Sequence, residues 1–401
     1  MRAAPALRKA TSDVSLVEMA PLLALITILA LQTPAPVPAA DAPAGKRAAV
    51  DIAALIEPIR LRHDLPGIVA AIVDREGAVA IGACGVRERG QSASLSILDR
   101  MHLGSCTKSM TATLCARLVG RDVLGWKTTI GEHFADWGDG FDAGWKSVTL
   151  EQLLTLRGGV GGDIAPKLWG RLFTSKATPR AQREELARGI LASPPKSTPG
   201  TQFEYSNASF AIAGLMAERA AGKDFEELMQ LELFTPLAMA SAGFGPPLST
   251  KSGGEPIGHR PNGQSVGTGI GSDNPPAIAP AGRVHASLGD WAEYAALHLR
   301  GAKDGGLDIP AAQFARMHAQ PADELDAYAM GWGIAQREWG GRVLTHTGSN
   351  TMWFCVAWLA PEKGFGVLVA TNQGGDAAEK ACDEAASALI QAWTKRAGAA
   401  K

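Results

Sequence analysis

The hydrophobic and polar positions of the N-terminal part predict a helix, a hairpin and a second helix. Residues 50–62 place isoleucine and leucine at helical spacing. Two apolar runs follow, 68–73 and 78–83, and the acidic and glycine residues 74–77 between them are typical of a β-hairpin. Residues 105–119 return to helical spacing.

The middle of the chain, from about 121 to 300, has mainly helical spacing. Further helices are expected over four stretches: 150–156, 180–191, 210–221 and 225–234. A Gly- and Pro-rich stretch from 246 to 282 is nearly free of strand pattern and too long for a simple connector, and loops of this kind are often functional. Ser287 is expected to cap the next helix, with Asp290 three residues further on.

The last third of the chain returns to strand patterns before a closing helix at 377–393. Strands are expected at 329–334, 342–346, 354–359 and 365–370. Strands at both ends with helices between them predict one α/β (α+β) domain over residues 47–401. Its mostly antiparallel sheet is built from both chain ends and flanked by helices, with a largely helical subdomain inserted at about 121–300.

The first residues have the pattern of a secretory signal peptide. Basic residues precede a short apolar run at 20–31, and a Pro- and Ala-rich stretch offers a cleavage site near Ala39. The run is shorter than the roughly 20 residues that span a membrane. We therefore expect a signal peptide at 1–39, a linker at 40–46 and a periplasmic or secreted protein without stable membrane insertion after cleavage. An uncleaved N-terminal membrane anchor is the alternative.

Composition and charge exclude several classes of protein. The 39 Lys and Arg balance the 40 Asp and Glu, which argues against a nucleic-acid partner. The five cysteines are far apart without a CxxC pair, so zinc ribbons, iron–sulfur sites and disulfide-stapled scaffolds are not indicated. Because Walker, Rossmann and HExxH motifs and paired metal-ligand histidines are also missing from the sequence, we expect no cofactor and no metal.

The first candidate for chemistry is Ser105-Cys106-Thr107-Lys108, at the start of a predicted helix. A serine hydroxyl needs a base within hydrogen-bond reach, and residues three apart share a helix face. Burial would disfavour the charged form of Lys108, and a helix N-terminus offers N–H groups where negative charge develops. The spacing alone is weak evidence. Ser193 and Lys196 repeat it, but two prolines between them exclude the helix.

Two further motifs strengthen this candidate. Tyr205-Ser206-Asn207 precedes a predicted helix, where the tyrosine can relay a proton and the amide can orient a carbonyl. His346-Thr347-Gly348 lies at the end of a strand, where glycine lets a ligand approach the backbone. Taken singly, each position is better explained without a catalytic role, Tyr205 as a packed aromatic residue and His346 as a satisfied strand histidine.

In this order, the three motifs resemble the serine β-lactamase and penicillin-binding-protein superfamily, in its class C-like branch. That branch includes class C β-lactamases, D-Ala-D-Ala carboxypeptidases, D-aminopeptidases and family VIII esterases. The resemblance covers about residues 47–395 and includes the segments PGTQFEYSN, PAGRVHASLGDW and HTGSNTMWF. It is specific for the superfamily but not for one substrate.

The resemblance implies a role for each motif. Ser105 would be the acylated nucleophile, Lys108 its base and Tyr205 a proton relay, while Asn207 would bind the amide or ester flank of the substrate. The opposite wall would consist of His346, Thr347 and Gly348, and the backbone N–H groups of Ser105 and Ser349 would form the oxyanion hole.

Two departures from the family pattern bear on the substrate. β-Lactamases carry Lys-Thr-Gly where this chain has the triplet beginning at His346, and an ordinary histidine is mostly neutral above about pH 6.5. The His-Thr-Ser-Gly turn of many relatives is replaced by residues 156–159, Leu-Arg-Gly-Gly. We expect esterase or peptidase chemistry rather than strong β-lactamase activity.

The sequence therefore predicts a serine hydrolase that acts through an acyl-enzyme on small to medium ester, amide or peptide substrates. A D-Ala-D-Ala carboxypeptidase or a weak β-lactamase is the alternative within the family. A penicillin-binding or cell-wall sensor protein without turnover is the alternative of another class. Ser265 lies in a GxSxG pattern at 263–267, but the surrounding residues are typical of a loop rather than a strand–serine–helix elbow.

Overall fold

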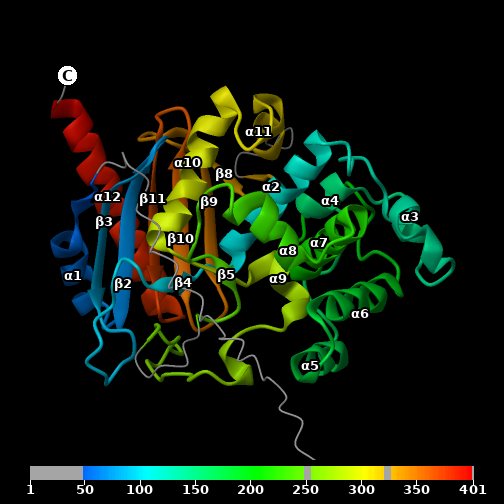
Figure 1. Cartoon of the computed structure of the whole chain (residues 1–401), viewed down its shortest axis with the longest axis horizontal. Coiled ribbons are helices and arrows are strands. Elements are labelled where there is room, and N and C mark those ends of the chain that lie inside the picture. The colour runs from blue at the N-terminus through cyan, green and yellow to red at the C-terminus, as the bar shows by residue number, and fades with distance from the viewer. Residues whose placement is uncertain (1–47, 248–253, 320–326, 400–401) are drawn as a thin grey trace, which may run out of the picture. The chain divides into compact units, whose positions relative to one another are not determined.

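One eight-stranded sheet joins strands from both ends of the described chain (Figure 1). The computed structural model describes residues 48–247, 254–319 and 327–399. The strands are, in spatial order, β1 (Val50–Asp51), β3 (Gly77–Gly85), β2 (Gly67–Asp74), β11 (Phe365–Thr371), β10 (Phe354–Ala360), β9 (Gly341–Ser349), β8 (Gly333–Arg337) and β7 (Ala327–Tyr328). Neighbours are antiparallel except β1 with β3. The pairing of β2 with β11 places Ile68 opposite Thr371. The predicted fold class is confirmed.

Both faces of the sheet are covered by helices because its central strands are apolar on both sides. In β2, Val69 and Ala71 point into one hydrophobic core, while Ile68 and Ala70 point into the other. The first core includes α2 (Thr107–Gly120) and α10 (Leu288–Asp304). The second includes α1 (Ala53–Arg62) and α12 (Asp376–Ala399).

A helical region follows α2 in the chain and packs onto it. Its helices are α3 (Ile130–His133), α4 (Leu150–Leu154), α5 (Pro166–Thr174), α6 (Pro179–Leu191), α7 (Asn207–Ala221), α8 (Phe225–Met229) and α9 (Ala279–Gly282). A small sheet of β4 (Arg100–His102), β6 (Val284–Ser287) and β5 (Gly243–Phe244) lies beside it, and α11 (Ala311–Met317) follows α10. Short 3₁₀ turns are η1 (Gly104–Cys106), η2 (Ala135–Trp137), η3 (Ala143–Trp145), η5 (Ile270–Ser272) and η6 (Pro276–Ile278).

Local predictions agree with the structure where short-range signals decide the conformation. The hairpin of β2 and β3 is confirmed. So is the cap of α10, in which the Ser287 hydroxyl accepts a hydrogen bond of 3.3 Å from the Asp290 N–H.

Two predicted elements were wrong. The single strand at 329–334 is interrupted, because Ala329 N–H donates to the Trp332 carbonyl in a tight turn and Gly331 has a φ of +78°. The helix at 225–234 changes after Met229 into a π-helical turn, η4 (Gln230–Phe234). The apolar spacing contains no signal for either change.

The predicted signal peptide at 1–39 and linker at 40–46 lie outside the described residues. Within residues 48–247, 254–319 and 327–399, the structure contains no helix that is both long and apolar enough to cross a membrane.

Candidate active site

Ser105 lies where the chain passes from the small sheet into a buried helix. The turn η1 carries Ser105 directly into α2, and α2 is buried on every side from Thr107 to Leu118. Because the helix is buried all round, its packing fixes how it is oriented in the core. Lys108 follows one turn after Ser105, and its Nζ donates a hydrogen bond of 3.1 Å to the Ser105 Oγ.

The Lys108 amine is enclosed completely by polar atoms and aromatic rings. Its exposed fraction is 0%, and its Nζ donates to the Asn207 Oδ1 at 2.7 Å and to the Ala281 carbonyl at 2.8 Å. Burial lowers its pKa from 10.5 to about 7. The charged amine can donate to all three oxygen atoms, whereas the neutral amine has two N–H groups for Asn207 and Ala281 and a lone pair that can take the Ser105 proton. The arrangement suits a general base.

Tyr205 lies beside this pair on the extended segment that precedes α7. Its ring centroid is 4.7 Å from the Lys108 Nζ. Burial of its hydroxyl end raises the Tyr205 pKa to about 12, and a hydrogen bond with Ser105 opposes this rise. The outer part of the side chain is open, since 41% of the residue is exposed. At neutral pH Tyr205 is therefore a hydroxyl donor next to the nucleophile.

The altered turn at 156–159 holds the segment that carries Tyr205. The Leu156 carbonyl accepts a hydrogen bond of 2.9 Å from the Glu204 N–H, and the Arg157 carbonyl accepts one of 2.7 Å from the Gly200 N–H. Because these are backbone contacts, the turn supports the segment although its sequence departs from the family pattern.

The opposite wall is the end of β9. His346 is buried, and its Nδ1 donates to the Thr347 carbonyl. Its Nε2 lies 3.2 Å from the Tyr328 hydroxyl, within hydrogen-bond distance. The His346 ring lies 6.3 Å from that of Tyr205, and the side chains of Thr347 and Ser349 are exposed.

Two glycines let the backbone of β9 touch the backbone beside the nucleophile. A Cβ on Gly104, whose φ is +46°, would lie 2.4 Å from the Ser349 nitrogen. A Cβ on Gly348 would lie 2.0 Å from the Leu103 carbonyl. No side chain fits either position, so the Ser349 backbone lies directly against Gly104, the residue that precedes Ser105. An oxyanion hole formed by the N–H groups of Ser105 and Ser349 requires these two backbone segments to be this close.

The structure thus brings all eight predicted site residues together from segments far apart in the chain. Their catalytic roles stay predictions. A sequence model of the family described as Beta-lactamase matches residues 52–392, a span that includes all eight. The chain belongs to the β-lactamase family.

Relatives in this family include a penicillin-binding protein and a hydrolase. Penicillin-binding protein 4 of Amycolatopsis lactamdurans is 27% identical over 336 residues, which cover 79% of this chain and 83% of that protein. Unguisins hydrolase ungD of Aspergillus violaceofuscus is 25% identical over 57% of this chain, but the match spans only 41% of its own length. The octameric penicillin-binding protein homologue from Pyrococcus abyssi has the same fold, with a TM-score of 0.69 and 21% identity, over 84% of this chain and 76% of its own.

The site also contains a charged network that the sequence analysis missed. Asp273 is buried, and its carboxylate lies 3.0 Å from the His102 Nε2 and accepts a hydrogen bond of 3.1 Å from the Asn350 Nδ2. The His102 Nδ1 accepts from the Gly104 N–H at 3.2 Å. Burial disfavours the Asp273 carboxylate, but His102 and Arg283 outweigh it and lower its pKa to about 2. The Asp273 carboxylate therefore links His102, which contacts the backbone next to Ser105, to Asn350, which is next to Ser349. The only sequence signal was its position in the long stretch at 246–282.

An exposed aromatic surface beside the site was also missed. The Tyr328 ring lies 6.3 Å from the Tyr205 ring and 5.5 Å from the Phe203 ring, and 45% of Phe203 is exposed. The pairing of β7 with β8 brings Tyr328 there, and this pairing depends on the turn after Tyr328 that the sequence did not predict.

The two alternative serines have no comparable surroundings. The Ser265 hydroxyl donates to the Glu88 carboxylate at 2.7 Å, and no helix begins at this serine, so it lies in a loop as expected. The Lys196 amine is paired with Glu204, which leaves Ser193 without its base.

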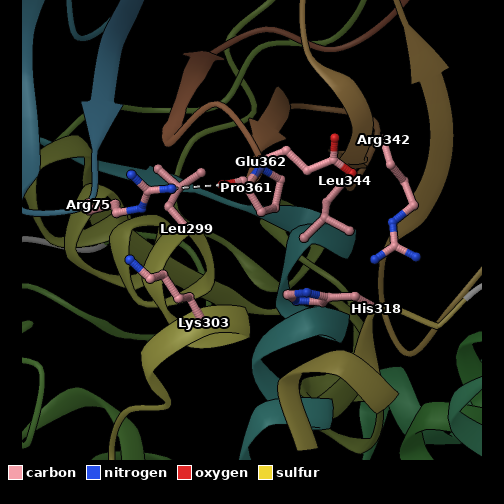
Figure 2. Close-up of a pocket in the computed structure, with 8 residues that line it drawn as sticks. All are labelled: Arg75, Leu299, Lys303, His318, Arg342, Leu344, Pro361 and Glu362. Carbon is pink, nitrogen blue, oxygen red and sulfur yellow. Dashed lines mark hydrogen bonds between the residues drawn. The ribbon is translucent and has the colours of Figure 1, made fainter. Parts of the chain in front are cut away.

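A cavity of about 300 Å³ lies on another part of this β-lactamase-family fold (Figure 2). Its lining residues are Arg75, Leu299, Lys303, His318, Arg342, Leu344, Pro361 and Glu362. None of the eight predicted site residues lines this cavity, and its lining offers no hydroxyl or thiol nucleophile. This cavity therefore does not have the residues that acyl transfer needs.

Proposed function

We propose that the protein is a serine hydrolase that forms an acyl-enzyme on Ser105. The observation that carries the proposal is the Lys108 amine, fully buried and 3.1 Å from the Ser105 hydroxyl, with a pKa of about 7. A buried ammonium without a carboxylate among its three hydrogen-bond partners is costly, so the site favours the neutral base.

The same geometry supports a complete proton path. Lys108 takes the Ser105 proton as the oxygen attacks the substrate carbonyl, and the N–H groups of Ser105 and Ser349 stabilise the negative oxygen. Tyr205, protonated at neutral pH, donates its proton to the leaving group and regains one from Lys108. Water then attacks the acyl-enzyme with the same groups in reverse.

The substrate class follows from the wall opposite Lys108. Position 346 carries a buried histidine in place of a fixed cation, and Phe203, Tyr205 and Tyr328 offer an aromatic surface for an acyl group. These features favour neutral or weakly charged esters and amides of small to medium size. D-Ala-D-Ala carboxypeptidase and weak β-lactamase activity use the same chemistry and are the alternatives.

The experiment is intact-mass analysis after incubation with a penicillin, a short-chain p-nitrophenyl ester and a D-Ala-D-Ala peptide. We expect an adduct on Ser105 that decays as product accumulates, with the fastest decay for the preferred class. Ser105→Ala should form no adduct, whereas the matched variant Ser265→Ala should behave like the wild type. One stoichiometric burst with a stable adduct on every substrate would instead support the non-turnover binding protein.

The partner in this proposal is a small molecule rather than nucleic acid. Export with removal of residues 1–39 belongs to the same proposal, because a periplasmic or secreted location exposes the enzyme to cell-wall peptides and external esters. N-terminal sequencing of protein recovered outside the cytoplasm tests it, and a cytoplasmic product that retains Met1 would contradict it.

A further inference from the structure

Two buried cysteines lie face to face beneath the nucleophile. Cys106 directly follows Ser105, and Cys355 lies on β10 opposite Gly348 of β9. Their sulfur atoms are 3.6 Å apart, and neither residue is more than 1% exposed. Neither thiol has a part in the proposed hydrolysis.

Both sulfur atoms contact backbone carbonyls near the proposed oxyanion hole. The Cys355 thiol lies 3.2 Å from the Leu103 carbonyl, and the Cys106 thiol lies 3.5 Å from the His346 carbonyl. A Cβ on Gly348 would come within 2.8 Å of the Cys355 sulfur. The pair therefore lies directly beneath the strand that carries Ser349.

We propose that Cys106 and Cys355 are a redox-active pair that a hydroperoxide converts into a disulfide, reversibly switching off Ser105. In the first step a thiolate sulfur attacks one peroxide oxygen, which gives a sulfenic acid and releases hydroxide. In the second step the other thiol attacks that sulfur, the S–S bond forms, and the sulfenic oxygen leaves as water. Overall, two thiols are oxidised and one hydrogen peroxide is reduced to two waters.

The surroundings favour Cys106 as the attacking sulfur. Burial disfavours its thiolate, but the hydrogen bond from the Cys355 thiol is the largest of the effects that oppose burial, and the Cys106 pKa is lowered. The Cys355 pKa is raised well above its usual range by burial and by Cys106. The Cys106 thiolate can attack the peroxide, and the Cys355 thiol that donates a hydrogen bond to it is in position to attack the resulting sulfenic acid.

Burial selects the oxidant. Both thiols are too buried for a bulky disulfide, whereas hydrogen peroxide is close to water in size, and Cys106 directly follows the half-buried Ser105. Cys84, Cys115 and Cys382 are also buried free thiols. Of these, Cys382 lies in the second hydrophobic core, whereas Cys106 and Cys355 lie in the first, which makes Cys382 the matched control.

Disulfide formation is expected to disturb the site. The sulfur atoms must close from 3.6 Å to about 2.05 Å, which moves η1 and β10 toward each other. The contacts of Gly104 and Gly348 leave no free space to absorb this movement. Since a displacement of about 1 Å can cost up to about 100-fold in rate, we expect hydrolysis to fall by between about tenfold and 100-fold.

The test uses reduced full-length protein treated with hydrogen peroxide, and its activity readout rests on the proposed function. Peptide mapping should show a Cys106–Cys355 disulfide, and the number of thiols titrated after denaturation should fall by two. Dithiothreitol should restore ester hydrolysis. Oxidised glutathione should not react with the folded protein. Cys355→Ala should keep basal activity and resist inactivation by peroxide. Cys355→Val is a second variant with a larger side chain. Cys382→Ala should remain sensitive to peroxide.

Three results would overturn the proposal. They are a Cys355–Cys382 disulfide, inactivation through sulfinic acid without a disulfide, and a Cys106–Cys355 disulfide that leaves activity unchanged. Peptide mapping does not depend on catalysis, and the activity of the reduced protein is measured first. A protein that forms the disulfide but hydrolyses none of the substrates would thus contradict the proposed function and not the pairing.

Discussion

Protonation of Lys108 should control the pH dependence of hydrolysis. Burial lowers its pKa from 10.5 to about 7, a difference that corresponds to about 5 kcal/mol between the charged and neutral forms. Only the neutral amine can accept the Ser105 proton. We therefore expect kcat/KM to be nearly constant above about pH 8 and to fall about tenfold for each pH unit well below 7.

The lowered pKa of Lys108 should also make the stability of the folded protein depend on pH. The unfolded chain, with a Lys108 pKa near 10.5, binds more protons than the folded chain between about pH 7 and 10.5. The cost of burying the amine is therefore fully present below pH 7 and disappears as the pH rises to 10.5. Relative to Lys108→Met, the wild-type free energy of unfolding should rise by up to about 5 kcal/mol across this range.

Two assays check this reasoning. The first measures kcat/KM for a p-nitrophenyl ester from about pH 5.5 to 9.5, with Lys108→Met expected to lose about 10²–10⁴ in rate. The second follows denaturant unfolding of both proteins at several pH values. A wild-type kcat/KM that keeps rising tenfold per pH unit beyond pH 9 would show that Lys108 keeps an ordinary pKa. The assignment of the base would then fail.

Four further predictions concern other residues of the site. Ser105→Ala should abolish hydrolysis in the ester assay while Ser265→Ala leaves it nearly intact, and the reverse result would favour a lipase-like elbow. Tyr205→Phe should fold normally by circular dichroism but lose about 10²–10⁴ in turnover, and a loss below about threefold would remove it from the mechanism. Asp273→Asn should lower kcat more than it changes KM, because it places an amide against the His102 and Asn350 donors, and equal changes in both would indicate a general structural role. His346→Lys should shift kcat/KM from a neutral ester toward a carboxylate-bearing β-lactam above about pH 7.5, since a nearby cation favours a bound carboxylate. An unchanged ester-to-lactam ratio would refute charge selection there.

Features that depend on neighbours a few residues apart could be predicted from the sequence. Two apolar runs and the turn at 74–77 predict the β2–β3 hairpin, helical spacing predicts α2, and the Ser287 cap predicts the start of α10. The contact between Ser105 and Lys108 belongs to this class, because residues three apart share one face of a helix. Order along the chain and local element type were enough to indicate the superfamily, and with it the fold.

Tertiary structure decided everything that depends on which distant segments touch. Lys108 meets Asn207 across 99 residues, and its pKa falls only because packing excludes water from the amine. Asp273 joins His102 to Asn350, and Cys355 meets Cys106, through the pairing of strands and loops that no spacing encodes. Local patterns record the preferences of short segments, whereas burial, close backbone contact and charge pairing arise only when the sheet is closed from both ends of the chain.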